Sequence, residues 1–540
     1  MKKAVALVLA LIMLVALVAC GGGGTSTPGT SGTPATPGGD INVGQAGEIG
    51  KDAEIDATKT YKKEIMFVHP SPLRGDDPQI ASGTDTSIQN NLIYNQLIYY
   101  NFLEAKAEPE LAVSWVEESS SSYLFNLRKG VKFSNGEEFT SDDILFSFVE
   151  RPVLVTATQG TNVFNNIEKI ECIDEYTVRI ILKKADTDFL LKMYLPAYCI
   201  FNREACTADP EKGHRIGTGG WILTSYDGNV ESTFERFDDS WVWEEKGVSP
   251  TEKLIYRVMP EQSARAIAVQ NGEACASSYI NQMAELKEMQ RYDSIETAAY
   301  NAENVELLLF NMYDSIFSDD KNLRYAVAYA INIPDHMLLM QDGLGERAYT
   351  LWSKAQFAYY DDFGDAKLEH NLEKAKEYLA KSKHPNGVEI TITTVAYREP
   401  MATLMQEQLQ KLPGVTVKVE TVDTVGLAAL VKEKDTELVL YGCSQQPVGS
   451  RHRFLSTTGS SNRAYYYNDE LLAQYDAAMA EPDEAKRIKM YQDIQIFLND
   501  EKPYIPLFYS VTGAAWHKGV SGISWEPNYY TDFTYVVWEE

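Results

Sequence analysis

Hydrophobic and polar positions repeat with two different periods in the last third of the chain. Val388 to Thr394 and Val415 to Val419 alternate every second residue, which predicts two half-buried strands. Between them, Pro400 opens a segment whose apolar residues recur every three or four positions, as expected of a helix with one buried face. These apolar residues are Met401, Leu404, Met405, Leu409 and Leu412. A strand, a helix and a second strand in this order predict a βαβ unit.

The sequence around this unit continues the mixed pattern. A more continuously apolar run, 437–441, predicts a third strand. Pro482 precedes a second helix that ends before Pro503. The buried stripe of that helix contains Ile488, Tyr491, Ile494 and Leu498. The body of the chain is therefore predicted to be α/β.

One upstream block carries clear turn and capping signals. Asn135-Gly136 stands between two short apolar runs and predicts a tight turn. Thr140 and Asp143 have the spacing of a helix N-cap and its third helical position, ahead of another apolar helix face. These signals predict local structure and by themselves indicate no function.

The first twenty residues form a separate apolar run. Lys2 and Lys3 precede an unbroken apolar stretch, 4–19, which is shorter than the roughly 20 residues that a membrane-spanning helix needs. A basic start and a short apolar run are typical of a signal peptide. The end of the run, 17–20, reads L-V-A-C and resembles the lipobox of bacterial lipoproteins. We therefore predict a signal peptide, 1–19, and a lipid on Cys20; a plain secretory signal with an incidental cysteine is the alternative.

The next segment is predicted to be a tether. Residues 21–39 contain only Gly, Thr, Ser, Pro and Ala, a composition that cannot bury a core. Segment 20–59 would then hold the body close to the cell membrane, outside the cytoplasm. A glycosylated stalk would have a similar composition.

Composition excludes several classes of function. The formal net charge is −28, and it becomes −30 once the signal peptide removes Lys2 and Lys3. Because affinity for nucleic acid comes from basic residues that neutralise phosphates, we predict no nucleic-acid partner. The sequence contains no C-x-x-C, H-E-x-x-H, G-x-S-x-G or phosphate-binding loop motif, so we predict no metal, no cofactor and no catalytic residue. Cys199 and Cys206 are close enough in sequence for a local disulfide, although spacing alone cannot establish one.

Several motifs of the body resemble one known family. The stretch 109–115, P-E-L-A-V-S-W, is followed by 123–136, Y-L-F-N-L-R-K-G-V-K-F-S-N-G. Together they resemble the signature of family 5 extracellular solute-binding proteins, the receptors of ABC importers for oligopeptides, dipeptides, nickel chelates and related solutes. Later segments agree with the family in order and spacing: 217–221, 264–273, 309–311 with 323–332, and 502–508. The resemblance covers nearly all of the body.

The resemblance implies a two-lobed α/β fold of the periplasmic-binding-protein type (type II, cluster C) with an extra inserted domain. The implied boundaries are 60–82, 212–303 and 505–540 for a discontinuous domain I, 83–211 for the inserted domain II, and 304–504 for domain III, the opposing lobe. Two strands that cross near 305–311 and 505–509 would form the hinge. Closure of the lobes about this hinge would bury the solute.

The function that the resemblance implies is binding without turnover. The chain would be a monomeric receptor that captures a peptide or peptide-like solute and delivers it to an ABC permease in the membrane. The same fold can serve a sugar, a metal chelate or an opine-like compound. A membrane-anchored hydrolase and an adhesin that binds a macromolecule without closing are the alternatives from other classes.

The resemblance also points to individual residues. Ser82, Gly83 and Thr84 fall where family members pair their backbone with an extended ligand, and an ordinary turn before a helix is the alternative. Trp352 and Tyr509 are candidate aromatic walls of the cleft. Core packing is the alternative for both.

The sequence departs from its relatives in one loop of domain III. Peptide-binding members often carry G-W-x-x-D there, and the aspartate pairs with the free α-amino group of the peptide. Here 442–446 reads G-C-S-Q-Q, so that Gln446 stands in the aspartate position. We therefore predict that a free N-terminus is not a dominant recognition element. Gln445, Gln446, Arg451 and Arg453 are the predicted polar contacts, with a solvated loop as the alternative for the basic pair.

Overall fold

The computed structural model describes residues 43–44, 55–73, 75–81, 84–101, 106–155, 161–281, 283–354, 356–444, 462–525 and 531–540. These residues all belong to the second of two units, 40–540. The predicted signal peptide, Cys20 and the segment 21–39 lie outside the described residues. Within the described ranges, no helix is long and apolar enough to cross a membrane.

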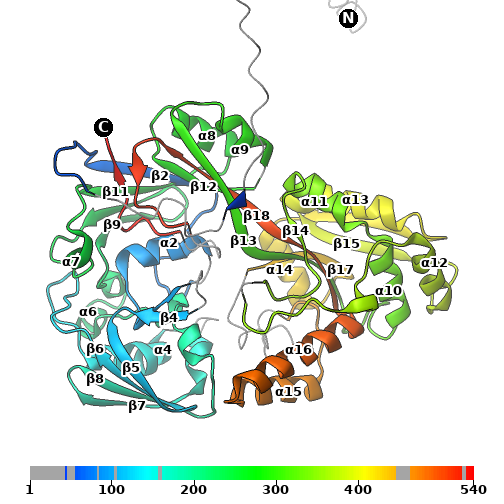
Figure 1. The fold of residues 1–540 in the computed structure, drawn as a ribbon, viewed down its shortest axis with the longest axis horizontal. Helices are drawn as coiled ribbons and strands as arrows, with labels where there is room; N and C mark the ends of the chain where they lie inside the picture. The colour runs from blue at the N-terminus through cyan, green and yellow to red at the C-terminus, as the bar shows by residue number, and fades with distance from the viewer. Residues whose placement is uncertain are drawn as a thin grey trace, which may run out of the picture. The chain divides into compact units, whose positions relative to one another are not determined.

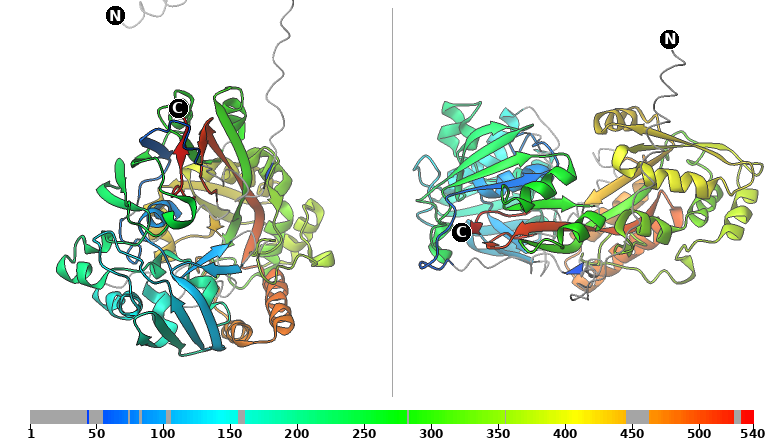
Figure 2. Two further views of the ribbon diagram at one scale, coloured as in Figure 1. Left: turned by 60° about the vertical axis from the view of Figure 1, so that its left-hand side comes forward. Right: turned by 90° about the horizontal axis from the view of Figure 1, so that it is seen from above.

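One large sheet organises the fold, and two long strands run through its centre. β13 (Ile295–Phe310) and β18 (Tyr504–His517) pair antiparallel over both of their ends, with register shifts between Asn301 and Val305 and between Glu306 and Leu307. They are the predicted crossing strands, and Figures 1 and 2 show them side by side. All but the last residue of β18 are buried, which explains its nearly continuous apolar run.

The sheet on one side of this pair has the order β18-β12-β2-β11-β10-β9. Its strands are β2 (Glu64–His69), β9 (Trp221–Asp227), β10 (Glu231–Arg236), β11 (Lys253–Val258) and β12 (Ala276–Ile280). A core that includes Phe67, Trp221 and Trp525 packs on one face, and α8 (Gln262–Gln270) and α9 (Met283–Met289) cover the other. The neighbouring elements are α2 (Thr84–Ile93), α7 (Trp243–Lys246), β1 (Val43–Gly44), β19 (Val520–Ser521) and β20 (Val537–Trp538).

On the other side the order is β13-β17-β15-β16, and it contains the predicted βαβ unit. β15 (Glu389–Val395) pairs parallel with β16 (Thr416–Val422), and α13 (Glu399–Leu409) connects them. β17 (Leu438–Ser444) is the predicted third strand and also pairs parallel with β15. The prediction of strand, helix and strand from their periodicities is therefore confirmed.

Helices cover both faces of this second half. α10 (Lys321–Ala330), α11 (Ile333–Gln341), α12 (Leu372–Lys381) and α13 pack on one face. α14 (Thr424–Glu433), α15 (Asp469–Ala480) and α16 (Glu484–Glu501) pack on the other. α16 buries Tyr491, Ile494 and Leu498, as its sequence stripe predicts. A short strand, β14 (Glu346–Arg347), pairs with β18.

Residues 98–208 form a separate group of small elements. A four-stranded antiparallel sheet has the order β5-β6-β8-β7, and β3 pairs with β4. The strands are β3 (Ile98–Asn101), β4 (Lys106–Pro109), β5 (Ala112–Ser119), β6 (Ser122–Leu127), β7 (Ile167–Asp174) and β8 (Thr177–Leu182). The helices are α3 (Ser141–Leu145), α4 (Arg151–Leu154), α5 (Phe189–Lys192) and α6 (Arg203–Ala208). This group has its own hydrophobic core, as an inserted domain requires.

The predicted turn and cap are both present in this group. The N–H of Gly136 donates to the carbonyl of Phe133 at 2.8 Å, and Gly136 has φ +90°, which favours glycine. The N–H of Thr140 donates to the Asp143 carboxylate at 3.0 Å, which completes a capping box at the start of α3.

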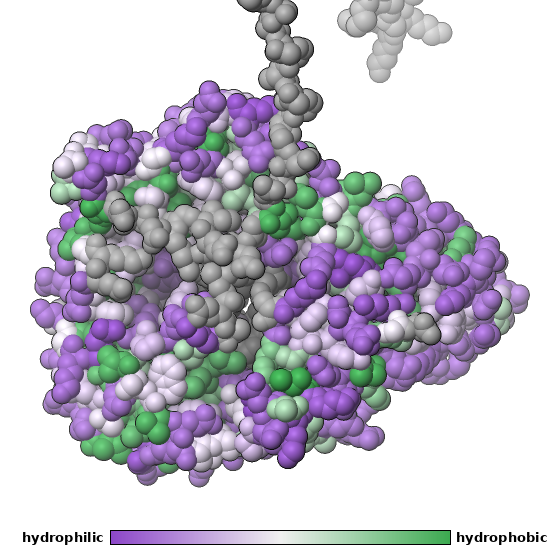
Figure 3. Space-filling view, viewed as in Figure 1, coloured by the Kyte–Doolittle hydropathy of each residue, from purple (hydrophilic) through white to green (hydrophobic). Residues whose placement is uncertain are grey.

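On the face seen in Figure 3, hydrophilic side chains predominate and hydrophobic ones form small separate patches. Cys199 and Cys206 form no disulfide in the structure, and the other described cysteines, Cys172, Cys275 and Cys443, form none either. The local disulfide that the sequence left open is therefore not formed.

Two of the family-like segments, 109–115 and 217–221, meet at Asn95. Its side-chain amide donates to Glu110 at 2.8 Å, and its oxygen accepts from Thr218 and from the Trp241 indole at 3.0 Å each. The N–H of Gln96 donates to the other oxygen of Glu110 at 2.9 Å. The motif residues Glu110 and Thr218 thus join residues 98–208 to the first half of the large sheet. Burial raises the pKa of Glu110 to about 7, against the opposing effect of these hydrogen bonds.

Glu110 predicts a specific pH dependence of stability. Its folded pKa of about 7 lies above the ordinary value of 4.5, so the folded chain binds this proton more tightly than the unfolded chain does. Ionisation of Glu110 therefore costs stability as pH rises from 4.5 to 7, and costs nothing below that window. Between pH 5 and pH 8 the native chain loses unfolding free energy as Glu110 ionises. In Glu110→Gln this loss should be smaller, by about 1–2 kcal/mol.

Denaturant unfolding at the two pH values measures this difference. The matched control is Glu118→Gln, which changes an exposed glutamate of β5 that pairs with Arg179 and should leave the loss unchanged. Equal losses in the native chain and in Glu110→Gln would contradict the prediction.

Candidate binding site at the carboxyl ends of β15 and β17

The ends of three parallel strands meet beside the crossing strands. β15, β16 and β17 run in the same direction, so their carboxyl ends lie on one edge of the sheet. Ser444, the last residue of β17, pairs with Asn304 of β13, where that strand passes from one half of the sheet to the other. In α/β sheets, ligands bind outside the carboxyl ends of the strands. This edge is therefore the candidate site.

A buried ion pair lies at this edge. Glu306 of β13 accepts from Arg398 Nε at 2.7 Å and from Arg398 Nη2 at 3.0 Å. Arg398 ends the short helical turn η6 (Ala396–Arg398), which directly follows β15. The two residues are 8% and 7% exposed. Burial alone would lower the pKa of Arg398, but the Glu306 carboxylate raises it overall, so the guanidinium stays charged.

Gly442 of β17 makes room for this ion pair. A Cβ at Gly442 would stand 2.2 Å from Arg398 Nη2 and 3.0 Å from Glu306 Oε1. Any other residue would therefore displace the ion pair. The close approach of Arg398 thus explains why the G-C-S-Q-Q segment begins with glycine.

Asn304 ties the ion pair to both crossing strands. Its side-chain amide donates to Glu306 Oε1 at 3.0 Å and lies 3.3 Å from the hydroxyl of Ser510 in β18. Glu306 therefore accepts three hydrogen bonds. A buried carboxylate that is satisfied in this way holds its partners in fixed positions.

Aromatic side chains flank the pair. The Tyr397 ring centroid is 4.5 Å from the Arg398 guanidinium carbon, and Tyr397 is 62% exposed. The Arg463 guanidinium carbon lies 4.5 Å from the Tyr441 ring centroid in the same way. The edge therefore offers the exposed ring of Tyr397, which suits binding through stacking. Among the described residues, no three His, Cys, Asp or Glu side chains are grouped so as to hold a metal ion.

The structure brings two of the predicted site residues together. The Tyr509 hydroxyl donates to the backbone carbonyl of Trp352. Trp352 is fully buried and Tyr509 is 5% exposed, and both belong to the core beneath α14–α16. This packing fits the alternative that both rings are core residues, and their role as walls of a cleft stays a prediction.

The other predicted site residues are not tested. Ser82, Gly83, Gln445, Gln446, Arg451 and Arg453 lie outside the described residues. Thr84 begins α2, but its side chain is not among those described.

The sequence patterns did not indicate four residues of this edge: Asn304, Glu306, Arg398 and Ser510. One signal was present: Glu306 is the single charged residue in the apolar run 305–310. A charge in a buried strand requires a partner, and the sequence does not identify Arg398 as that partner.

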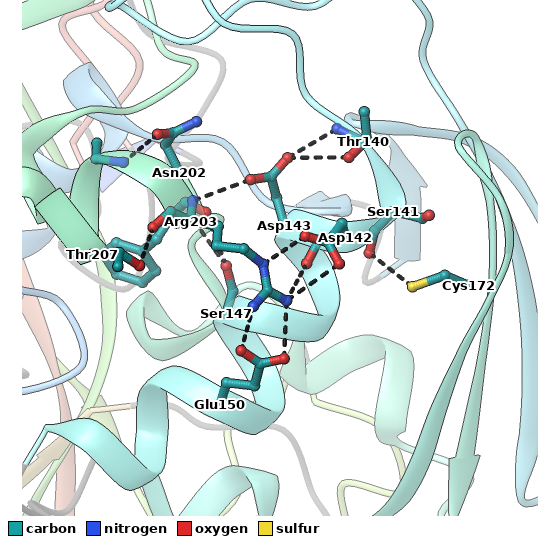
Figure 4. Close-up of polar contacts among 12 residues, drawn as sticks. Thr140, Ser141, Asp142, Asp143, Ser147, Glu150, Cys172, Asn202, Arg203 and Thr207 are labelled. Carbon is teal, nitrogen blue, oxygen red and sulfur yellow. Dashed lines mark hydrogen bonds and ion pairs between the residues drawn. The ribbon is translucent and has the colours of Figure 1, made fainter.

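A second polar cluster has a structural role. Arg203 of α6 forms an ion pair with Asp142 of α3 and bonds to Glu150 of η1 (Phe146–Glu150), as Figure 4 shows. The N–H of Arg203 donates to Asp143 at 3.2 Å. These contacts tie α6 to the α3–η1 segment, and the charged groups satisfy one another. We therefore assign this cluster to packing.

Comparison with known proteins identifies the family of the chain. The sequence model described as bacterial extracellular solute-binding proteins, family 5 middle, matches residues 106–466. The chain is 25% identical over 520 residues to heme-binding protein A of Haemophilus influenzae, and this match covers 89% of this chain and 93% of that protein. It is 26% identical over 514 residues to the dipeptide-binding protein of Escherichia coli, with 87% and 94% covered.

A solved structure gives the same fold. The dipeptide-binding protein of Pseudoalteromonas sp. SM9913, in complex with Met-Leu, superimposes with a TM-score of 0.79 at 22% identity. The match covers 88% of this chain and all of that one. The predicted two-lobed α/β fold is thereby confirmed.

The buried ion pair predicts a large and non-additive effect on stability. Glu306→Gln leaves the Arg398 charge buried without its counter-ion and should lower the unfolding free energy by about 3–5 kcal/mol. Glu306→Gln combined with Arg398→Met removes both charges and should lower it by less than the single change does. Denaturant unfolding of the three chains measures both effects.

Glu118→Gln is again the matched control, since its partner Arg179 is partly exposed and such pairs contribute about 1 kcal/mol or less. If Glu306→Gln costs no more than this control, the ion pair does not have the role assigned to it.

Proposed function

Since the chain belongs to family 5 of the bacterial extracellular solute-binding proteins, we propose that it captures a peptide or peptide-like solute for an ABC importer. The solute binds at the carboxyl edge of β15 and β17, and the protein delivers it to a permease in the membrane. The protein acts as a monomer and catalyses no reaction. The observation that carries this proposal is the position of the Glu306–Arg398 pair, beside exposed Tyr397, where the crossing strands meet that edge.

Contacts far from the hinge support capture by closure. Both the N–H and the hydroxyl of Thr187 donate to the carbonyl of Met479, at 3.2 and 3.0 Å. Lys184 Nζ lies 3.9 Å from an oxygen of Asp476. Thr187 belongs to the proposed domain II, 83–211, and Met479 to the proposed domain III, 304–504. Rotation about β13 and β18 would break and remake these few contacts, as hinge closure requires.

The remaining domain boundaries are part of the proposal. Domain I comprises 60–82, 212–303 and 505–540, and the junction at Asn95 lies where domain II enters it. A signal peptide, 1–19, directs the chain out of the cytoplasm. A lipid on Cys20 anchors the tether 20–59 to the cell membrane, which keeps the receptor near its permease.

The loop after β17 indicates which chemical groups the solute carries. Between Glu437 and Asp469 the sequence has no acidic residue, so this loop has no carboxylate to pair with a free α-amino group. Gln445, Gln446, Arg451 and Arg453 are the proposed polar contacts, and a carboxylate or a blocked N-terminus on the solute would suit them. One relative is named for heme binding and another for dipeptide binding. The second candidate is therefore a non-peptide solute, such as a metal chelate, a sugar or an opine-like compound.

Paired peptides test this function and the missing amino-group contact. Peptides that bind should raise the melting temperature of the protein, because a ligand at about 100 times its Kd adds about 2.7 kcal/mol to stability. N-acetylated and free-amine forms of one peptide should raise it to a similar extent, since the loop after β17 supplies no carboxylate for the amino group and the Glu306 carboxylate is already paired with Arg398. Thermal unfolding with both forms measures the effect.

Two outcomes would count against the proposal in different ways. Strong stabilisation by free-amine peptides alone would show that an acidic residue reaches the amino group after all. An unchanged melting temperature with every peptide of two to five residues would refute the peptide assignment and leave the non-peptide solutes.

A further inference from the structure

We propose that Glu306 is a specificity-determining residue that withholds Arg398 from the solute. The buried pair places no net charge at the η6 end of the site, so that a free carboxylate of the solute gains no ionic contact there. This inference rests on the proposed function and names the kind of group that this part of the site accepts.

The geometry of the pair is the first argument. A guanidinium group binds a carboxylate best through two parallel N–H donors. Arg398 uses Nε and Nη2 in this way, at 2.7 and 3.0 Å from the two oxygens of Glu306. That side of the guanidinium is therefore occupied by a carboxylate of the protein itself, and the two formal charges cancel.

The surroundings fix the pair in place. Asn304 donates to Glu306 at 3.0 Å from one side. The backbone of β17 also approaches the pair closely, because a Cβ at Gly442 would come within 2.2 Å of Arg398 Nη2. Arg398 is 7% exposed, so water cannot replace Glu306 at low cost. The guanidinium cannot turn towards a solute without breaking a buried bidentate contact.

The position of the pair is the second argument. It lies directly after β15, at the carboxyl edge where the site is placed, and it contacts the exposed ring of Tyr397 at 4.5 Å. A solute at this edge therefore meets the ring of Tyr397 and a neutral pair. An arginine in the same place without Glu306 would present a full positive charge to a carboxylate.

Two roles of Glu306 predict opposite effects of its removal on the binding of free acids. If Glu306 only oriented Arg398 towards a solute carboxylate, its removal would weaken binding of free acids. If Glu306 neutralises Arg398, its removal frees a carboxylate receptor. Glu306→Gln should then raise the ratio of free-acid to carboxamide binding by about tenfold, the size of one charged contact.

Capture from two peptide pools measures this ratio. One N-acetylated tripeptide pool is prepared once as free acids and once as carboxamides, and both are offered in equal amounts to the detergent-purified full chain. Mass spectrometry of the bound peptides gives the ratio for the native chain, for Glu306→Gln and for the control Glu118→Gln. Circular dichroism shows that each variant is folded. The control should leave the ratio unchanged, because Glu118 lies in β5 and pairs with Arg179.

A second variant covers the case in which Glu306→Gln does not fold. Glu306→Gln with Arg398→Gln replaces one neutral pair by another, and it should keep the ratio within about threefold of the native value. A fall of tenfold or more in this double variant would mean that Arg398 binds the solute carboxylate in the native protein, and it would overturn the proposal.

The remaining outcomes separate this inference from the proposed function. An unchanged or lower ratio in folded Glu306→Gln overturns the inference alone. Capture of neither pool by the native chain refutes the peptide assignment, and the inference falls with it.

Discussion

The antiparallel pairing of β13 with β18 is the constraint on which the rest of the structure depends. These two strands belong to both halves of the large sheet, and their register shifts where they pass from one half to the other. A shifted register locally weakens a ladder and increases its twist, so the passage is the natural place for bending. The same passage brings Asn304 next to the end of β17. The proposed hinge and the candidate site are therefore built from the same few residues.

The Glu306–Arg398 pair at this passage combines rigidity with neutrality. Glu306 is held by Arg398 and Asn304, and Gly442 allows the close approach that this requires. Removing either charge would leave the other buried without a counter-ion, which is the costly outcome for any ionic pair in a protein interior. The pair therefore fixes η6 to the crossing strand, and it presents no net charge to a solute at the edge. The aromatic ring of Tyr397 remains as the exposed feature.

Much of the fold follows from local patterns in the sequence. β15, α13 and β16 follow from periods of two and of about 3.6 residues, and the capping box at Thr140 follows from spacing alone. The Glu306–Arg398 pair does not, because its members are 92 positions apart and meet only through the order of strands in the sheet. The sequence likewise indicates Trp352 and Tyr509 as large aromatic residues, but only the structure shows that they pack together in the core. Gly442 belongs to a sequence motif, but only the structure shows that it leaves room for the close approach of Arg398.

The central claim is that a solute bound at the edge of β15 and β17 closes the protein about β13 and β18. Hydrogen–deuterium exchange at the amide of Thr187 tests it most directly, because this N–H donates to Met479 across the proposed lobes. Addition of a peptide that raises the melting temperature should slow exchange at Thr187 and at the end of β17 together, by about tenfold or more. Slower exchange at the end of β17 with unchanged exchange at Thr187 would show binding without closure and would contradict the account.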